Sequence, residues 1–203
     1  ESLAGTDRVA VRVYREVDDG PDSLRLKIYR IGKPVSLSRV MPVLENLGLY
    51  VVQETGFPVD RRGANGEPFD RAHIHDFEMK SDALRDRDLK ELAPGLEDAM
   101  LAIADRRAED DGFNRLIVEI GVTWREAAFL RTCARYRQQT GLDPSQAIQE
   151  EALAACPEIA RGLLELARVK FDPAFTDDKK VRSDAVWEVS DTLRKQLDDV
   201  ASL

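Results

Sequence analysis

The sequence predicts an α+β protein in which a small antiparallel sheet module is followed by an all-helical module. Near the N-terminus apolar and polar residues alternate, which is the two-residue period of a half-buried strand. Beyond about Ser81 the apolar residues recur every three or four positions, as on amphipathic helices. The 203 residues are 43% hydrophobic and 33% charged, which allows each part a core of its own. We therefore expect one module over residues 1–81 and a second over 82–203.

The first module is predicted to contain a hairpin, a helix and two further strands, in that order. Alternation in RVAVRVYREV (over 9–17) and in LRLKIYR, with the turn-forming DDGPDS between them, predicts an antiparallel hairpin. A helix follows, for which Ser36 or Ser38 is the expected cap and Gly48 the expected left-handed stop. YVVQET and HIHDFEM predict two more strands. Strand, helix, strand and strand make three quarters of a ferredoxin-like unit.

The second module consists of predicted helices separated by short turns. The first, LKELAPGLEDAMLAIADRRAEDD, is expected to be interrupted at Pro94 and Gly95. The later helical patterns lie in NRLIVEIG, GVTWREAAFLRTCARYRQQTGL, PSQAIQEEALAA, PEIARGLLELARVKF and VRSDAVWEVSDTLRKQLDDVASL.

The arginine-rich stretch GVTWREAAFLRTCARYRQQTGL is the most distinctive of these helices. Thr123 and Glu126 have the spacing of a capping box. An apolar stripe, with Leu130 and Ala134 beside it, predicts that this helix packs into a core; its members are Phe129, Cys133 and Tyr136. Arg131 and Arg135 lie on a different face, where they are expected to pair with carboxylates or to contact another domain.

Charge and composition disfavour several classes of function. The net charge of −8 repels a polyanion, so nucleic acid is not an expected partner. No apolar run approaches the roughly 20 residues of a membrane span. Cys133 and Cys156 are read as small buried thiols of a reduced, cytoplasmic protein. The chain begins with ESLAGTDR and not with methionine, so we expect a processed or excised piece.

The only two histidines, His73 and His75, face the same side of a predicted strand. A metal site would need a third ligand, and Asp76 and Glu78 face the other way, so no metal is predicted. Packing or hydrogen bonding on the sheet face is the expected role, although a general base remains open. The chain has neither glycine-rich phosphate motif, so neither NAD nor ATP is expected to bind to it alone. No catalytic residue is predicted.

Four segments resemble the region upstream of the catalytic domain in the large bacterial NAD-specific glutamate dehydrogenases. They are LRLKIYRIGKPVSLSRVMPVLENLGLYVVQE, HIHDFEM, DDGFNRLIVEIGVTWREAAFLRTCARYRQQTG and EEALAACPEIARGLLELARVKFDP. The most specific element is DGFNRL…G-x-x-WRE-x-x-x-LR-x-x-ARY. The resemblance implies an oligomeric parent enzyme that oxidatively deaminates L-glutamate to 2-oxoglutarate and ammonia with NAD⁺.

For this segment the resemblance implies an ACT-like βαββαβ module followed by helical motifs. The second helix and last strand of a full ACT repeat are not evident in the usual order. We therefore expect a truncated or permuted variant, with the strand at 9–17 completing the sheet.

Two functions of different classes follow. The first is a non-catalytic regulatory and assembly segment, inactive alone, whose partners are the other domains and subunits of its enzyme. ACT modules typically sense amino acids at the first strand-to-helix loop, which exposes N–H groups at a helix N-terminus. The matching positions are Gly32, Lys33 and Val35, with Asn46 and Gly48 at the far end of the helix. The alternative is a free-standing helical adaptor that binds a protein, less readily nucleic acid, through Arg131 and Arg135. A small independent enzyme using His73 or His75 is a third reading.

Overall fold

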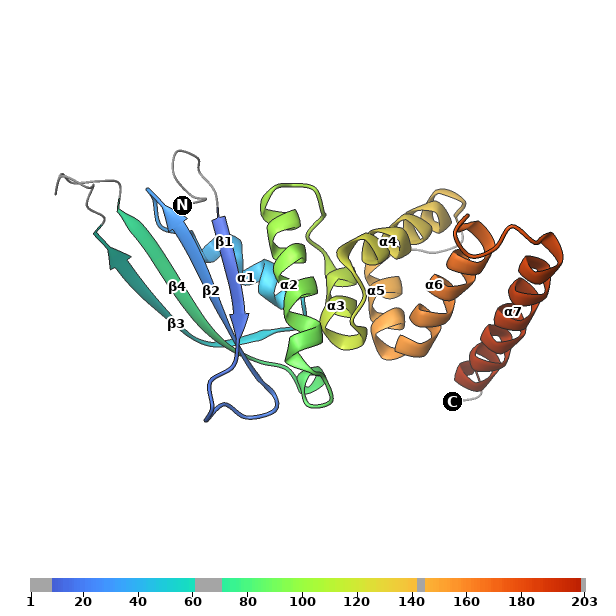
Figure 1. The fold of residues 1–203 in the computed structure, drawn as a ribbon, viewed down its shortest axis with the longest axis horizontal. Coiled ribbons are helices and arrows are strands. Elements are labelled where there is room, and N and C mark those ends of the chain that lie inside the picture. The colour runs from blue at the N-terminus through green and yellow to red at the C-terminus, as the bar shows by residue number, and fades with distance from the viewer. Residues whose placement is uncertain (1–8, 61–70, 142–144, 202–203) are drawn as a thin grey trace. The chain divides into compact units, whose positions relative to one another are not determined.

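The computed structural model describes residues 9–60, 71–141 and 145–201 (Figure 1). It forms two compact units, Glu1–Ala128 and Phe129–Leu203, which are described separately. The elements are β1 (Val9–Tyr14), β2 (Ser23–Ile31), α1 (Leu37–Asn46), β3 (Tyr50–Val59), β4 (Ala72–Lys80), the 3₁₀ turn η1 (Asp82–Leu84), α2 (Leu89–Ala104), the 3₁₀ turn η2 (Gly112–Asn114), α3 (Arg115–Ile120), α4 (Trp124–Gln139), α5 (Gln146–Ala155), α6 (Pro157–Phe171) and α7 (Lys179–Ala201).

The sheet of the first unit has the strand order β1-β2-β4-β3, and each neighbouring pair is antiparallel. This confirms the predicted fold class and the predicted hairpin of β1 and β2. The first strand ends at Tyr14, so it is shorter than the expected 9–17.

The sheet is a permuted version of the βαββαβ arrangement. In that arrangement the strand after the second helix lies beside the first strand. Here β1 pairs with β2 and occupies that place, although it precedes β2 in the chain. The second helix of that arrangement is α2, which the sequence pattern predicted as a helix but placed in the helical module; it follows β4 and packs against β1. Because α2 packs with the sheet, the change from strands to helices near residue 81 does not by itself mark the end of a domain. The predicted division between residues 1–81 and 82–203 stays a prediction.

One face of the sheet carries the core of the first unit. The register places Leu26 of β2 between Val13 of β1 and Phe77 of β4, and all three are buried. Leu44 and Leu47 from the end of α1 are also fully buried. Burying one such side chain stabilises the fold by roughly 1.5–3 kcal/mol. The opposite face carries the polar members of the alternation.

Two expectations about helix geometry in this unit were wrong. Ser36 is the residue before α1, but its side chain makes no capping bond; its Oγ lies 2.8 Å from Oγ of Ser38. Helix α2 runs through Pro94 without interruption, since the proline removes one backbone donor while leucines on both sides of it are buried. The left-handed stop at Gly48 is confirmed by its φ of 76°.

Helix α4 has the predicted capping box but not the predicted buried stripe. The N–H of Thr123 donates to Glu126 Oε2 (2.7 Å), and the N–H of Glu126 donates to Thr123 Oγ1 (3.2 Å). Phe129 and Tyr136, however, are 38% and 68% exposed, and Cys133 is exposed too. The buried side chains are Ala127, Leu130, Arg131 and Ala134, at positions i, i+3, i+4 and i+7. Leu130 and Ala134, which were expected beside the stripe, are thus confirmed as buried, whereas the three residues of the stripe itself are not. The small side chains of Ala127 and Ala134 allow a close approach.

The cysteine prediction also needs correction. Cys133 is exposed and Cys156 is half-buried, so neither is a fully buried thiol. Partial desolvation raises the pKa of the Cys133 thiol, which keeps it in its less reactive protonated form.

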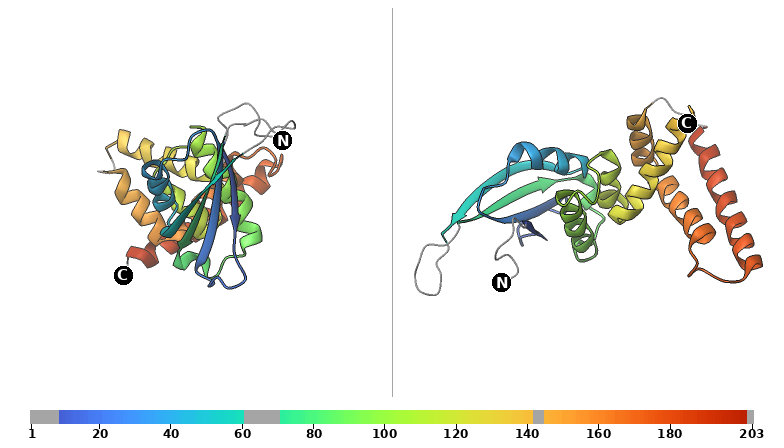
Figure 2. Two further views of the ribbon diagram at one scale, coloured as in Figure 1. Left: turned by 90° about the vertical axis from the view of Figure 1, so that its left-hand side faces the viewer. Right: turned by 90° about the horizontal axis from the view of Figure 1, so that it is seen from above.

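In the second unit α6 and α7 form an antiparallel helical hairpin (Figure 2). Gly162 of α6 lies against Leu193 of α7, at a point where a Cβ atom would clash with the leucine. Arg182 closes the connection, because its guanidinium donates to the carbonyl oxygens of Val169 (2.8 Å) and Thr176 (2.5 Å). A cation at the C-terminal end of α6 also complements the helix dipole.

Candidate functional site

The loop between β2 and α1 holds three of the residues predicted to bind an effector. Gly32 has a φ of 88°, and its N–H donates to the carbonyl oxygen of Arg71 (2.8 Å). Lys33 is exposed. The N–H of Val35 donates to Nε2 of His75 on β4 (3.2 Å). Two of the backbone donors expected to receive a ligand are therefore bonded within the module.

His75 lies beneath this loop and is only 8% exposed. Its Nδ1 is 2.7 Å from Oε1 of Glu54 on β3, and its ring stacks with Phe77 at a centroid distance of 6.4 Å. Gly56 lies directly opposite His75 in the strand register, where a Cβ atom would stand 3.5 Å from the Glu54 oxygen. The predicted hydrogen-bonding role on the sheet face is confirmed for His75. No sequence signal marked Glu54 as its partner, because the pairing depends on the strand register.

The remaining two predicted effector residues lie at the other end of α1. Asn46 donates through Nδ2 to Oδ1 of Asp110 (2.9 Å). A Cβ atom on Gly48 would meet Cβ of Arg115 at 3.4 Å, so the α3 start packs closely here. Ten helical residues span about 15 Å, which separates these residues from the loop at the helix start. Within a single chain, the three loop residues and the two residues at the end of α1 therefore do not line one pocket. The effector role of all five stays a prediction.

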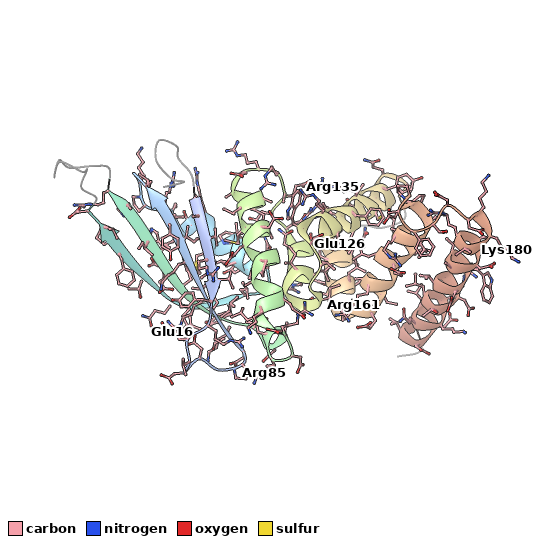
Figure 3. All side chains as sticks on the ribbon, viewed as in Figure 1. Glu16, Arg85, Glu126, Arg135, Arg161 and Lys180 are labelled. Atoms are coloured by element: carbon pink, nitrogen blue, oxygen red, sulfur yellow. The ribbon has the colours of Figure 1, made fainter. Side chains whose placement is uncertain are left out.

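The two arginines predicted to form an interface differ in exposure. Arg131 is 3% exposed, whereas Arg135 is exposed and is labelled on α4 in Figure 3. They do not make one exposed surface, and the interface role stays a prediction. Near the start of the same helix, Trp124 donates its indole N–H to Asp98 (2.7 Å), and the Arg125 guanidinium lies 4.2 Å from the indole centroid.

Ion pairs cover the sheet face that the helices leave open. Arg25 binds both oxygens of Asp19 at 2.9–3.1 Å, with Glu16 (labelled in Figure 3) at 3.7 Å and Glu78 at 3.5 Å. The hydrogen bonds from Arg25 hold the pKa of Asp19 below its ordinary value. The alternation of the sequence places Arg25 and Glu78 on the polar faces of their strands, but only the register of β2 and β4 pairs them.

A second polar cluster on this face is centred on Asp76. Tyr14 donates its hydroxyl to the Asp76 carboxylate (2.8 and 2.9 Å), and Lys27 Nζ lies 3.5 Å from the same group. Burial, and then the Asp76 carboxylate, raise the pKa of Tyr14. Both clusters pair opposite charges, and the raised pKa values of Tyr14 and Lys27 keep these two side chains protonated, so the clusters act as structural ion pairs.

Two kinds of feature are absent from the described residues. No group of three histidine, cysteine, aspartate or glutamate side chains among them is arranged to hold a metal ion. Within the same ranges, no helix combines the length and apolarity that crossing a membrane requires.

Two family models match the chain in consecutive segments. The model for the ACT3 domain of glutamate dehydrogenase matches residues 8–92, which include the sheet and the start of α2. The model for helical motif 3 of glutamate dehydrogenase matches residues 108–173, from η2 to the end of α6.

Similar proteins include three described as NAD-specific glutamate dehydrogenase. The protein from Pseudomonas aeruginosa is 34% identical over 202 residues, which are 100% of this chain and 12% of that protein. The protein from Halomonas elongata is 33% identical over 195 residues, or 96% of this chain and 12% of its own length. The protein from Mycobacterium tuberculosis is 31% identical over 173 residues, or 83% and 10%. The chain thus spans about an eighth of these relatives.

Proposed function

Because this chain belongs, as one segment, to the family of large NAD-specific glutamate dehydrogenases, we propose that it is a non-catalytic regulatory and assembly segment of such an enzyme. The enzyme as a whole oxidatively deaminates L-glutamate to 2-oxoglutarate and ammonia with NAD⁺, in the cytoplasm. The observation that carries this proposal is the order of the two matches, an ACT3 domain and then a helical motif, over a sheet and then a run of helices.

The internal pairing of polar groups supports a non-catalytic role. The candidate loop is bonded to Arg71 and His75, and the open sheet face is an array of ion pairs. These groups bond to one another in opposite-charge or donor–acceptor pairs, and none of these pairs joins a nucleophile to a base, which is the arrangement that covalent catalysis uses.

Exposed apolar side chains in the second unit support a role in assembly. Tyr136, Phe171 and Trp187 are each more than two-thirds exposed, and Val181 and Leu197 are about half exposed. Burying these side chains against another protein surface would remove apolar area from water and stabilise the contact. We propose other domains and subunits of the same enzyme as the partners.

The test compares the full-length gene product with the 203-residue chain. NADH formation from L-glutamate and NAD⁺ is followed by absorbance, and the assembly state by sedimentation. We expect turnover from the full-length protein and none from the 203-residue chain. In the full-length protein, Trp187→Gln and Phe171→Gln together should weaken assembly, while Val17→Gln, an exposed site in the β1–β2 turn, serves as the control. Glutamate turnover by the 203-residue chain, or none by the full-length protein, would contradict the proposal.

The finer part of the proposal is amino-acid sensing at the α1 ends. Thermal melts with a panel of amino acids test it directly. A ligand at about 100 times its dissociation constant adds about 2.7 kcal/mol to the free energy of unfolding, which raises Tm by several degrees. Lys33→Ala should remove the shift and Lys90→Ala, on the first turn of α2, should keep it. Flat melts across the panel in the full-length protein would end the sensing proposal and leave assembly in place.

A further inference from the structure

We propose that His75 is a proton-operated latch on the loop between β2 and α1. The neutral side chain holds Val35 against the sheet, and the protonated side chain releases it. The inference rests on the geometry of this chain alone and not on the function proposed above.

The proton positions on His75 follow from its neighbours. A backbone N–H can only donate, so Nε2, which faces the N–H of Val35 at 3.2 Å, must be the unprotonated acceptor. In a neutral imidazole the proton is then on Nδ1, where it is donated to Oε1 of Glu54 at 2.7 Å. The ring therefore joins three segments: β4, which carries it, β3 through Glu54, and the loop through Val35.

Protonation breaks this arrangement at one end only. The added proton goes to Nε2, which then faces Val35 as a second donor, and the hydrogen bond is lost. At the other end the imidazolium keeps its contact with the Glu54 carboxylate. Because the imidazolium is positive and the carboxylate negative, this contact becomes an ion pair. The ring therefore stays on the sheet, and the loop is the part that is released.

The groups around His75 come from β2, β3, the loop and the start of α1. From β3 the ionisable neighbour is Glu54, and Gly56 lies directly opposite the ring. From β2 the residue opposite is Ile28, with Arg30 two positions on, paired in register with His73 of β4. The loop contributes Lys33 and the start of α1 contributes Ser36, Ser38 and Arg39. Histidine is the side chain whose charge ordinarily changes between about pH 5 and pH 8; arginine, lysine and glutamate ordinarily keep theirs over this interval.

The released segment is short, because a second attachment does not depend on His75. The N–H of Gly32 donates to the backbone carbonyl of Arg71, and neither group titrates. Release is therefore confined to the residues between Gly32 and the first turn of α1. It frees one backbone N–H at the N-terminus of that helix, where the dipole favours an anion.

Amide hydrogen exchange, followed by NMR on the 203-residue chain, tests the latch. After correction for the intrinsic pH dependence of exchange, protection of the Val35 amide should fall by about two- to tenfold on going from pH 8 to pH 5, as expected for the loss of one hydrogen bond. The Gly32 amide is the internal control, and its protection should not change. In His75→Gln the side-chain oxygen accepts from Val35 at any pH, so its Val35 protection should be independent of pH.

A second variant keeps the test decisive if His75→Gln does not fold. In Glu54→Gln the imidazolium loses its anionic partner, so half-release should occur at a lower pH than in the unmodified chain. The proposal is overturned if Val35 and Gly32 respond alike in the unmodified chain. It is also overturned if His75→Gln keeps the pH response, or if Glu54→Gln leaves the pH of half-release unchanged.

Discussion

At the scale of single residues, the pairing of Asp19 with Arg25 is a source of stability that depends on pH. The Asp19 side chain is 7% exposed and accepts three hydrogen bonds from the guanidinium. Its lowered folded-state pKa means that this stability is fully present above the unfolded value of 3.8 and is lost as the pH falls through the folded value.

Asp19→Asn should therefore lower the free energy of unfolding by about 1–3 kcal/mol at pH 7. The difference from the unmodified chain should shrink in acid, as urea denaturation at several pH values would measure. Asp18→Asn makes the same charge change at an exposed neighbour and should be nearly neutral. A loss that is constant down to pH 2 would contradict the ion-pair account.

Glu119 on α3 is the opposite case. Its Oε2 is buried without a hydrogen-bond partner among the described residues, and Arg115 Nε is 4.0 Å from the other oxygen. Burial raises the pKa of Glu119. Ionised Glu119 therefore destabilises the fold above its folded-state pKa, and this cost disappears as the pH falls below the unfolded value of 4.5.

Glu119→Gln should raise the free energy of unfolding by about 1 kcal/mol at pH 7, because it removes the buried charge. Near pH 4 the variant and the unmodified chain should melt together. Calorimetry at the two pH values measures this, and a destabilised variant at pH 7 would mean that the pair with Arg115 outweighs the burial.

At the scale of elements, α2 closes one edge of the sheet. The Glu97 side chain accepts from the N–H of Val13 on β1 at 2.8 Å, which supplies a partner for an edge donor. The opposite edge strand, β3, carries the exposed side chains of Tyr50 and Val52.

Glu97→Ala should cost about 1–2 kcal/mol, because it leaves the Val13 N–H without its partner. Glu97→Gln keeps an acceptor oxygen at the same reach and should cost much less. Chemical denaturation ranks the two, while the exchange rate of the Val13 amide locates the effect. Equal losses in both variants would show that the charge, and not the hydrogen bond, is what matters.

Which elements could be predicted depended on how local their signals are. Two features depend only on residues that are close together in the sequence, and both are confirmed: the hairpin of β1 and β2, and the capping box of Thr123 and Glu126. The buried face of α4 depends on what packs against it, and the stripe from Phe129 to Tyr136 was the wrong choice. For the candidate site, the hydrogen-bonding role of His75 was predictable, but Glu54 and Val35 meet it only through strand register and loop path.

At the scale of the whole molecule, the chain has two compact units, each with its own buried residues. Leu26 belongs to the core of the first and Leu193 to that of the second, and both are at least 95% buried. The sequence predicted two modules divided near residue 81, where strands give way to helices, and that division stays a prediction.

We expect two separable unfolding transitions by calorimetry. A buried leucine replaced by alanine costs about 2–5 kcal/mol, so Leu26→Ala should lower the midpoint of one transition and Leu193→Ala that of the other. Exposed Leu197→Ala is the control for the second variant. A single transition that both variants lower would mean that the units unfold cooperatively.

The place of β1 in the sheet has a consequence for the order of events during synthesis. A ribosome releases the N-terminal side first, so β1 is available before β2, its partner, emerges. In a βαββαβ unit of ordinary order, the first strand would wait with one edge open until the last strand was made. Here every strand of the sheet has emerged once β4 has, and α2 can close the β1 edge immediately afterwards. The growing chain thus spends less time with an unpaired strand edge exposed to neighbouring nascent chains.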